Sequence, residues 1–487
     1  MSAFDANWSL MTPEIVLATL ALVIFTIDFM TGIKGNKAFI GRLSILSLFV
    51  TIVLVIFTNN QSASIADMFY VDAYAMVFKV ILLLGVAFVI AISMYYLDLH
   101  DDVYQGEYYS LMLFAALGTM IMVSSADLIT LFIGLELLSI SSYCLAGFKK
   151  YKKKSTEAAL KYVILGGAAS AFILYGMSFV YGLTGTTSLV EIGEVMPALF
   201  EEYTLMMTLS LLFMLAGFGF KISIVPFHMW APDVYEGAPT PVTAFLTVVS
   251  KLAAFGIILR VFFVGFGTVY DEWAFVFAVL AALTMIVGNF IALTQRNVKR
   301  LMAYSGIAQA GYILVPIAAV ATVSGTFSMV AFYAAAYVLM TLGAFAIITI
   351  VTEEAGNEDI TSFSGLYQRS PYMAVAMTTF LVSLGGLPLT AGFFGKVYIL
   401  QGAVTADMLW LAVIMIVTSI ISFYYYFGII KHMFMRGPKD DQRSELNVPF
   451  SLSAVVTVSL AGTIILGVLP NLLLNFFNDI NWMAMFM

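Results

Sequence analysis

The chain has very little cysteine and little charge. Cys144 is the one cysteine among 487 residues, which excludes an intrachain disulfide and a cysteine-ligated iron–sulfur cluster, and leaves too few thiols for a cysteine-rich structural zinc site. Charged residues make up 10% of the chain, far below the roughly 25% of an ordinary soluble domain. The composition therefore argues against a soluble fold and against an iron–sulfur protein.

Most of the chain is apolar, since 62% of its residues are hydrophobic. Apolar stretches of about 18 to 28 residues recur from end to end, and each can cross a hydrocarbon core of about 30 Å as a helix. We expect an all-α polytopic membrane protein. The sequence predicts fourteen transmembrane helices, at residues 13–32, 38–58, 73–97, 109–124, 127–147, 156–183, 203–222, 240–266, 272–295, 299–320, 325–351, 372–404, 406–432 and 449–477.

The basic residues indicate an orientation for these helices. Sixteen of the 22 lysines and arginines fall in connections on one side of the fourteen-helix arrangement, and none falls in a connection on the other side. The positive-inside rule makes the basic side cytoplasmic, so both termini are expected on the periplasmic or equivalent side. The sixteen are Lys34, Lys37, Arg42, Lys149, Lys150, Lys152, Lys153, Lys154, Arg296, Lys299, Arg300, Arg369, Lys431, Arg436, Lys439 and Arg443.

Six basic residues remain within the predicted helices. A basic residue at mid-membrane costs about 2.5–3.5 kcal/mol on insertion scales, so it normally faces protein or a water-filled interior. We expect Lys79 and Arg260, which lie near helix ends, to extend to the membrane interface. Lys161 either pairs with Glu157, four residues earlier on the same helix face, or contributes to a buried site. The others, Lys221, Lys251 and Lys396, are candidates for a buried site.

Glu136, in LFIGLELLSIS, has a similarly central position with the opposite charge. A carboxylate at that depth must be paired, neutralised or hydrated. Lysines on neighbouring helices therefore suggest an ion pair inside the bundle, with Lys221 as the expected partner. Such a pair can be purely architectural. Four lysines and one glutamate on five separate helices nevertheless exceed what one structural bridge needs.

Two predicted helices are interrupted by proline. Pro226 follows Lys221 in FKISIVPFHMW, and Pro388 lies in GGLPLTAGFFG, shortly before Lys396. Proline removes a backbone hydrogen bond and breaks or kinks a helix. The interrupted helices are the seventh and the twelfth, and an odd offset of five gives them opposite orientations in the membrane. This arrangement indicates an inverted repeat with ion sites at the broken helices; two simple kinks are the alternative.

The repeat predicts a division of the chain into four parts. Residues 1–108 carry helices 1–3, residues 109–270 form the first five-helix repeat, residues 271–434 form the inverted second repeat, and residues 435–487 carry the last helix.

Lysine suits proton exchange, because a buried lysine can lose its charge whereas arginine stays charged. Between the two lysine-bearing halves lie side chains that can order water or serve only as contacts between helices. They are Ser305, Gln309, Tyr312, Tyr333 and Tyr337.

The chain resembles the antiporter-like membrane subunits of respiratory complex I over essentially its whole length. The resemblance rests on four segments, GFGFKISIVPFHMWAPDVYEGAPTPVTAFL, SKLAAF, NVKRLMAYSGIAQAGY and LGGLPLTAGFFGKVYIL. The chain length, the segment LFIGLELLSISSYCLAGF and the lysine at position 251 look closest to the bacterial subunits related to mitochondrial subunit 2.

The resemblance implies a protein of the bacterial inner membrane that translocates protons, driven by quinone reduction elsewhere in the complex. It implies neighbouring membrane subunits on both flanks, with the lipid bilayer around them and no nucleic-acid partner. It also implies that this chain binds no cofactor, and that NADH, FMN, the iron–sulfur clusters and the quinone belong to other subunits.

The resemblance further implies a proton relay, and its residues agree with those singled out by burial and charge. Carried over by position, the relay comprises Glu136, Lys161, Lys221, Lys251 and Lys396. His228 and Tyr312 are auxiliary candidates. For His228, at the loop edge, capping or packing is the alternative role. Relatives commonly have histidine where this chain has Gln309, and glutamine can order water but cannot take up a proton near pH 7.

These observations favour a proton-translocating subunit of an NADH-quinone oxidoreductase that carries no redox centre itself. A cation/proton antiporter subunit of the Mrp type, which shares the fold and the lysine motif, is the alternative. A redox catalyst in its own right is weakly supported, since the sequence shows no cysteine cluster and no GxGxxG at a strand-to-helix turn. A structural spacer would not need five charges inside the membrane.

Overall fold

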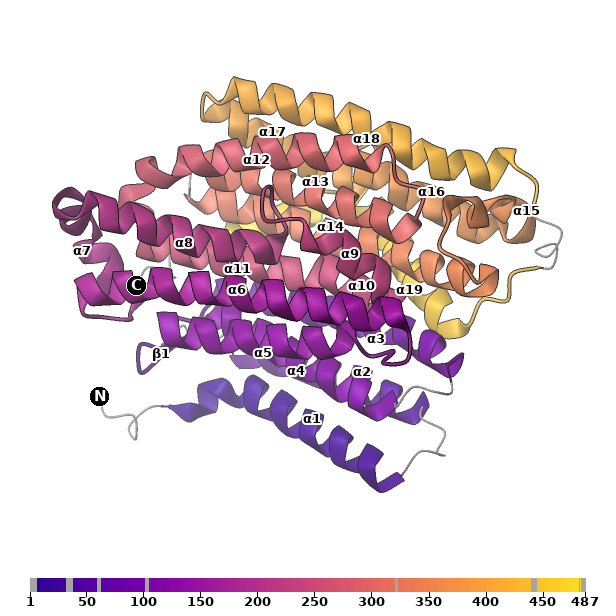
Figure 1. The fold of residues 1–487 in the computed structure, drawn as a ribbon, viewed down its shortest axis with the longest axis horizontal. Helices are drawn as coiled ribbons and strands as arrows, with labels where there is room; N and C mark the ends of the chain where they lie inside the picture. The colour runs from indigo at the N-terminus through magenta and orange to yellow at the C-terminus, as the bar shows by residue number, and fades with distance from the viewer. Residues whose placement is uncertain are drawn as a thin grey trace.

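The computed structural model describes residues 7–31, 38–58, 63–100, 105–319, 323–438, 445–480 and 482. Long helices lie side by side across it, from α1 (Thr12–Thr31) at one edge to α18 (Leu409–Met435) at the other (Figure 1). Thirteen helices in the described ranges are long and apolar enough to cross a membrane. The predicted all-α polytopic fold is confirmed, and the predicted helix 372–404, the twelfth, is present as two halves, α16 (Pro371–Gly385) and α17 (Ala391–Thr405).

The remaining helices of membrane-crossing length follow the predicted segments closely. They are α2 (Ala38–Thr58), α3 (Ala73–Asp98), α4 (Gln105–Ser124), α5 (Leu128–Ala146), α6 (Lys153–Thr184), α8 (Thr204–Ile222), the continuous run of α10 (Thr240–Phe245), η3 (Leu246–Ser250), α11 (Lys251–Arg260) and η4 (Val261–Gly265), α12 (Tyr270–Ala292), α13 (Val298–Ala319), α14 (Val323–Ala355) and α19 (Phe450–Val468).

Shorter elements cover the ends of this bundle or form parts of broken helices. They are η2 (Trp8–Met11), β1 (Ala63–Ile65), β2 (Phe69–Val71), α7 (Leu189–Glu202), α9 (Trp230–Gly237), η5 (Gly267–Val269), η6 (Ile360–Phe363), α15 (Leu366–Arg369), α16 (Pro371–Gly385), α17 (Ala391–Thr405) and α20 (Asn471–Asp479). The two strands pair antiparallel.

The bundle has two distinct ends. We call one the hairpin end, because it carries β1, β2 and α7, and the other the basic end, because it carries the loop 147–152 and the turn 293–297 with their basic residues. Figure 1 shows β1 and α7 at one end and α15 at the other. Leu10 packs against the hairpin at Phe69, so the described N-terminal residues lie at the hairpin end. Lys34, Lys37, Lys439 and Arg443, which contributed to the predicted orientation, lie outside the described residues.

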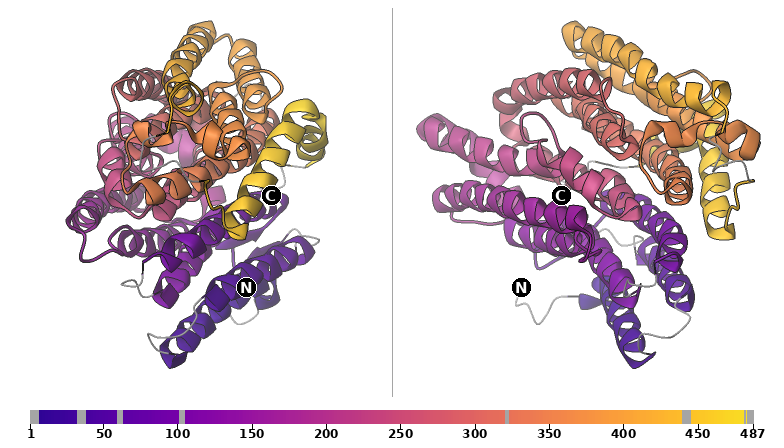
Figure 2. Two further views of the ribbon diagram at one scale, coloured as in Figure 1. Left: turned by 90° about the vertical axis from the view of Figure 1, so that its right-hand side faces the viewer. Right: turned by 45° about the vertical axis from the view of Figure 1, so that its right-hand side comes forward.

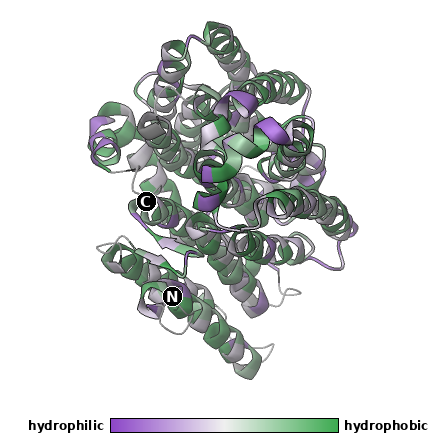
Figure 3. Cartoon of the chain, turned by 90° about the vertical axis from the view of Figure 1, so that its left-hand side faces the viewer, coloured by the Kyte–Doolittle hydropathy of each residue, from purple (hydrophilic) through white to green (hydrophobic). Residues whose placement is uncertain are grey.

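Burial is deepest in the middle of the bundle. The run Thr240–Gly265 and the helix Val298–Ala319 are fully enclosed, with 100% of their most apolar windows buried. Figure 2 shows α1 and α2 set at one edge and α18 at the opposite edge, and Figure 3 shows apolar colour over most of the helical surface. Apolar outward faces suit contact with lipid or with other membrane helices. The enclosed helices are therefore the ones that can hold polar side chains away from lipid.

One boundary and several short elements differ from the sequence-based expectations. The predicted helix 449–477 ends at Val468, because Pro470 follows, and α20 is a separate short helix. The helix before Pro226, by contrast, ends at its predicted boundary, Ile222, where Ser223 adopts the left-handed conformation (φ 59°). The amphipathic helix α7, the helix α9 and the β-hairpin were not expected. The four-part division of the chain and the inverted relation of the two repeats stay predictions.

Candidate functional site

Lys221 lies at the end of a broken helix in the protein interior. Its helix α8 stops one residue later, and the chain makes a turn through Pro226 before α9 begins at Trp230. The indole of Trp230 donates to the carbonyl of Phe220 (2.9 Å), and the amide of Val225 donates to Thr284 Oγ1 (3.0 Å). The break is therefore held in place by side chains that bond to backbone groups on either side of it.

Hydroxyl groups separate Lys221 from Glu136. Lys221 Nζ donates to Ser139 Oγ on α5 (2.5 Å), and its exposure is 2%. Glu136, one turn earlier on α5, instead accepts a hydrogen bond from Ser170 Oγ on α6. The expected direct ion pair between Lys221 and Glu136 is therefore absent, and each of these side chains contacts a serine instead.

Lys251 lies in the enclosed run, directly after the π-helical turn η3. Its exposure is 2%, and within the described residues its Nζ has no hydrogen-bond partner. Its Nζ lies 5.7 Å from the centroid of the Tyr235 ring. A Cβ on Gly306 would lie 3.2 Å from Lys251 Nζ and 3.3 Å from Tyr337 OH. The glycine thus leaves room for these two polar groups to approach each other on the face of α13.

Polar side chains continue along α13 beyond this point. Ser305 Oγ and Tyr426 OH share a hydrogen bond (2.5 Å). Gln309 donates to the carbonyl of Leu384 (3.0 Å) and accepts from the hydroxyl of Tyr333. Gln309 therefore joins α13 to α14 and to the end of α16 as a contact between helices; its part in ordering water stays a prediction.

Lys396 lies beside the second break. Helix α16 ends at Gly386, whose φ of 92° suits glycine, and α17 begins after Thr390. Lys396 Nζ donates to the freed carbonyl of Gly385 (3.0 Å) and to Ser419 Oγ (3.3 Å), and it faces the ring of Tyr312 at 4.3 Å. The arrangement matches the expectation that a broken helix offers carbonyls to a buried cation.

These groups form clusters at the first break, around Lys251 and at the second break, and the clusters together are called the polar track. Its members are Glu136, Ser139, Ser170, Lys221, Lys251, Tyr337, Ser305, Tyr426, Gln309, Tyr333, Tyr312 and Lys396. Near its middle, further buried polar atoms have no partner among the described residues, namely Ser223 Oγ, His228 Nδ1, Tyr235 OH and Thr341 Oγ1. Buried polar groups normally form hydrogen bonds, so this region suits ordered water.

Two predicted site residues have different surroundings. His228 is 6% exposed, and its carbonyl accepts from the amide of Ala231 (3.0 Å), so its backbone stabilises the break while its ring is buried. Lys161 lies apart from the track at the basic end, where it pairs with Glu157 and with Asp233 (2.8 Å each). The pairing with Glu157 is the one that the sequence spacing indicated.

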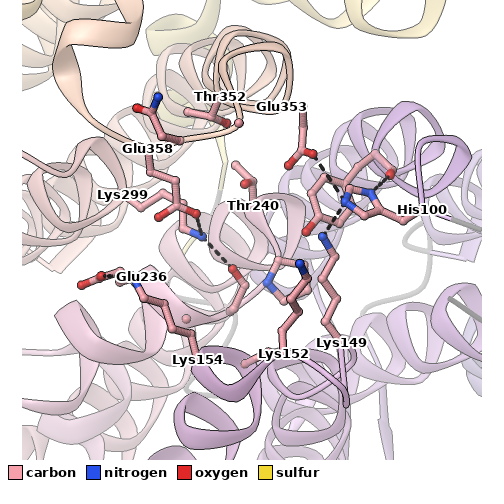
Figure 4. A pocket seen from close by; sticks show the side chains of 17 residues that line it. His100, Lys149, Lys152, Lys154, Glu236, Thr240, Lys299, Thr352, Glu353 and Glu358 are labelled. Carbon is pink, nitrogen blue, oxygen red and sulfur yellow. Dashed lines mark hydrogen bonds and ion pairs between the residues drawn. The ribbon is translucent and has the colours of Figure 1, made fainter. Parts of the chain in front are cut away.

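A pocket of about 340 Å³ opens near the basic end, and α3, α6, α9, α10, α13 and α14 all contribute to its lining (Figure 4). Lys149 Nζ lies 2.7 Å from His100 Nε2, which lies 3.5 Å from a carboxylate oxygen of Glu353. Thr240 lines the same pocket.

A polar helix face leads inward from this pocket. Thr240, Thr243, Thr247 and Lys251 recur at intervals of three or four residues, which places them on one face of the run. All four are buried. The pocket and Lys251 are therefore joined by hydroxyl-bearing side chains along one helix.

Two buried ion pairs at the hairpin end were not expected. Lys79 Nζ pairs with Glu14 (2.6 Å). Arg260 Nη2 donates to Asp72 Oδ1 (3.0 Å), and Arg260 Nη1 lies 2.9 Å from Asp72 Oδ2 in the same ion pair. The prediction that Lys79 and Arg260 extend to the membrane interface is wrong, because a buried carboxylate from another element meets each of them. The acidic partners are distant in sequence, and spacing along one helix could not reveal them.

Gln309 provides a test of whether a titratable group is needed in the middle of the track. We expect Gln309→His to change proton pumping by less than about twofold, because water bound by the neighbouring hydroxyls can carry the proton. Gln309→Leu should lower pumping more, since it removes both hydrogen bonds and strands a buried hydroxyl, at a cost of about 1–3 kcal/mol. Pumping in reconstituted vesicles measures both; a large gain on installing histidine would contradict this view.

Comparison with known proteins supports the predicted resemblance. Residues 125–422 match the family described as NADH:quinone oxidoreductase/Mrp antiporter, TM. A Brevibacillus brevis protein named NADH-quinone oxidoreductase subunit N is 45% identical, with 97% of this chain and 95% of the relative covered.

Solved structures agree with the sequence comparison. A chain of respiratory complex I from Thermus thermophilus aligns with a TM-score of 0.79 and 32% identity, over 95% of this chain and 99% of that one. A chain of the Mrp complex from Dietzia sp. aligns with a TM-score of 0.82 at 18% identity, over 96% and 97% of the two chains, which shows a shared fold alone.

Proposed function

Because the chain belongs to the NADH:quinone oxidoreductase/Mrp antiporter membrane family, and within it to the subunit N group, we propose that it translocates protons without carrying out redox chemistry itself. In this proposal NADH oxidation and quinone reduction take place elsewhere in the complex and drive proton movement through the polar track. The track uses Glu136, Lys221, Lys251 and Lys396, with Gln309 and Tyr312 supporting it.

The observation that carries the proposal is the polar track itself. Its three buried lysines lie in the middle of an otherwise apolar bundle, two of them at helix breaks. A buried ionisable group in a membrane protein is costly and is typically found where ions or protons move. Lysine can release and rebind a proton, whereas a structural cation could as well be arginine.

The proposed direction of movement follows from the geometry of the two ends. Protons enter at the pocket near the basic end, pass along the threonine face to Lys251, and reach Lys396 through Tyr337, Ser305 and Gln309. We place the basic end on the cytoplasmic side by the positive-inside rule. Lys396, on the far side of the second break, is then the lysine closest to release at the opposite side.

The proposal also covers partners and cofactors. Relatives with this fold occur in multi-subunit membrane complexes, and many apolar side chains on α6 and α18 are exposed. We propose that other membrane subunits of a complex I flank this chain in the bacterial cell membrane. NADH, FMN, iron–sulfur clusters and quinone are assigned to those other subunits, which agrees with the single cysteine.

The alternative function is that of an Mrp-type cation/proton antiporter subunit. The shared fold favours it, but the relatives at 45% identity bear the subunit N name. The proteins that purify with the chain distinguish the two: redox subunits are expected for the first function and further antiporter subunits for the second.

Replacing Glu136 tests the proposed function. Two unit charges about 4 Å apart interact by about 4 kcal/mol at an effective dielectric constant near 20, and by less at larger separations, and each 1.36 kcal/mol is about tenfold in rate. We expect Glu136→Gln to lower proton pumping and coupled quinone reduction together by about fivefold or more. The measurement uses the assembled complex in vesicles, with the exposed Glu194→Gln on α7 as control. Native rates in the Glu136 variant would refute a role for this carboxylate.

A further inference from the structure

Helix α9 carries two carboxylates that are each held from two sides. Asp233 and Glu236 lie three residues apart and so share a face of this short helix. We propose that Arg300 is a positioning residue, which holds α9 through these two carboxylates and thereby sets the surroundings of Lys221. This inference rests on the proposed function.

The contacts divide evenly between the oxygens of the two carboxylates. Arg300 Nη1, on α13, donates to Asp233 Oδ1 (2.8 Å) and to Glu236 Oε2 (3.0 Å). From the opposite side, α6 supplies Lys161 to Asp233 Oδ2 (2.8 Å) and Lys154 to Glu236 Oε1 (2.9 Å). Each carboxylate therefore connects α6, in the first predicted repeat, to α13, in the second.

The ion pairs of this network favour the charged forms of its two carboxylates. Burial alone would raise the pKa of the Asp233 carboxyl, but hydrogen bonds from Lys161 and Arg300 lower it overall. The Glu236 carboxyl has a lowered pKa for the same reasons, with Lys154 and Arg300 as its partners. Isolated exposed ion pairs contribute little to stability, whereas several charges with shared partners form a network that can contribute more.

Helix α9 is linked directly to the environment of Lys221. Its first residue, Trp230, stacks on Tyr162 (ring centroids 4.5 Å apart) and on Phe220 (4.9 Å). The ring of Tyr162 lies 5.8 Å from Lys221 Nζ, and the Trp230 indole donates to the carbonyl of the residue before Lys221. A shift of α9 therefore moves aromatic groups that enclose the lysine.

Arg300 also belongs to the helix that carries the middle of the track. Ser305 and Gln309 follow it on α13. Gln309 of the same helix donates to Leu384 at the end of α16, so a tie between α13 and α9 links the two broken-helix regions. Arg300 touches none of the track's lysines, so it acts through α9 and not on the proton.

The test compares Arg300→Gln, Arg300→Lys and Asp233→Asn in the complete purified complex, reconstituted in vesicles. The matched control is Glu157→Gln, which removes a 2.8 Å ion pair to Lys161 in the same surface cluster but connects only residues of α6. We expect Arg300→Gln and Asp233→Asn each to lower turnover and pumping per assembled complex by about three- to tenfold, and to raise the ratio of rates in H₂O and D₂O. Arg300→Lys and Glu157→Gln should stay close to the native complex.

The double variant Asp233→Asn with Arg300→Gln adds a second criterion. If Asp233 and Arg300 act through one contact, the double variant should lose no more turnover and pumping than the more severe of the two single variants. Native turnover and a native isotope ratio in Arg300→Gln would overturn the inference, as would an equal loss in Glu157→Gln. Replacement of Lys251 serves as the reference. If the Lys251 variant pumps at the native rate, the proposed function fails. If the Lys251 variant loses pumping while Arg300→Gln pumps at the native rate, only the positioning role is rejected.

Discussion

Replacing Lys221 by arginine is expected to lower proton pumping nearly as much as replacing it by alanine, by about tenfold or more. A positioned group that transfers protons typically contributes about 10²–10⁴-fold, and arginine cannot give up its proton under these conditions. The site is also tight, because Lys221 Nζ contacts Ser139 at 2.5 Å and faces Tyr143 and Tyr162. Proton uptake and release by reconstituted vesicles measure the effect.

The control for this comparison removes an exposed positive charge. Lys431 lies at the basic end of α18 and is exposed, so Lys431→Ala should pump normally. Guanidinium is larger than ammonium, and native gels must show equal amounts of assembled complex before rates are compared. If Lys221→Arg pumps at a near-native rate while Lys221→Ala does not, Lys221 serves only as a fixed counter-charge to Glu136.

Lys251 is expected to give the second large effect. Its Nζ lies in the middle of the track without a hydrogen-bond partner among the described residues, so both the pocket route and the second half of the track depend on it. We expect Lys251→Ala to lower coupled quinone reduction by about tenfold or more. Removing the side chain also leaves a cavity lined by Tyr235 and Tyr337, which water can fill without restoring a group that binds a proton.

The control for Lys251 is Lys153→Ala, an exposed change at the start of α6. An uncoupler that abolishes the proton gradient separates two causes of slow turnover. If the gradient alone limited the rate, the uncoupler would restore it in the Lys251 variant; if proton transfer is blocked, as proposed, the rate stays low. Native turnover in Lys251→Ala would place the route elsewhere.

The sequence predicted what depends on length, hydrophobicity and proline. Apolar runs located the transmembrane helices, and Pro226 and Pro388 located the two breaks to within a few residues. The interior position of Lys251 followed from its depth in an apolar run. Each of these features is encoded locally, in a window no longer than one helix.

The features that the sequence did not predict depend on contacts between distant segments. From their positions near helix ends, Lys79 and Arg260 are predicted to reach the interface. In the structure they pair instead with Glu14 and Asp72, which lie on other elements. The helix α9 is too short and too polar to stand out. Its place between α6 and α13 depends on ion pairs with residues of both helices.

Glu136 and Lys161 show the same limit for the candidate site. Charge and depth identified Glu136, but Ser170, which donates a hydrogen bond to its carboxylate, lies on a different helix. Lys161 had two open interpretations, and the structure shows it in an exposed cluster with Asp233. Residue type predicted the chemistry of these groups, whereas the partner of each group was set by packing.

The most direct test of the central claim, that protons cross the membrane through the polar track, is the number of protons released per NADH oxidised. The measurement compares vesicles containing the native complex with vesicles containing Lys251→Arg, at matched amounts of assembled complex and with Lys153→Ala as control. The account predicts that the Lys251→Arg complex releases fewer protons per NADH, or loses pumping and oxidation together. An unchanged ratio at an unchanged rate of NADH oxidation would contradict it.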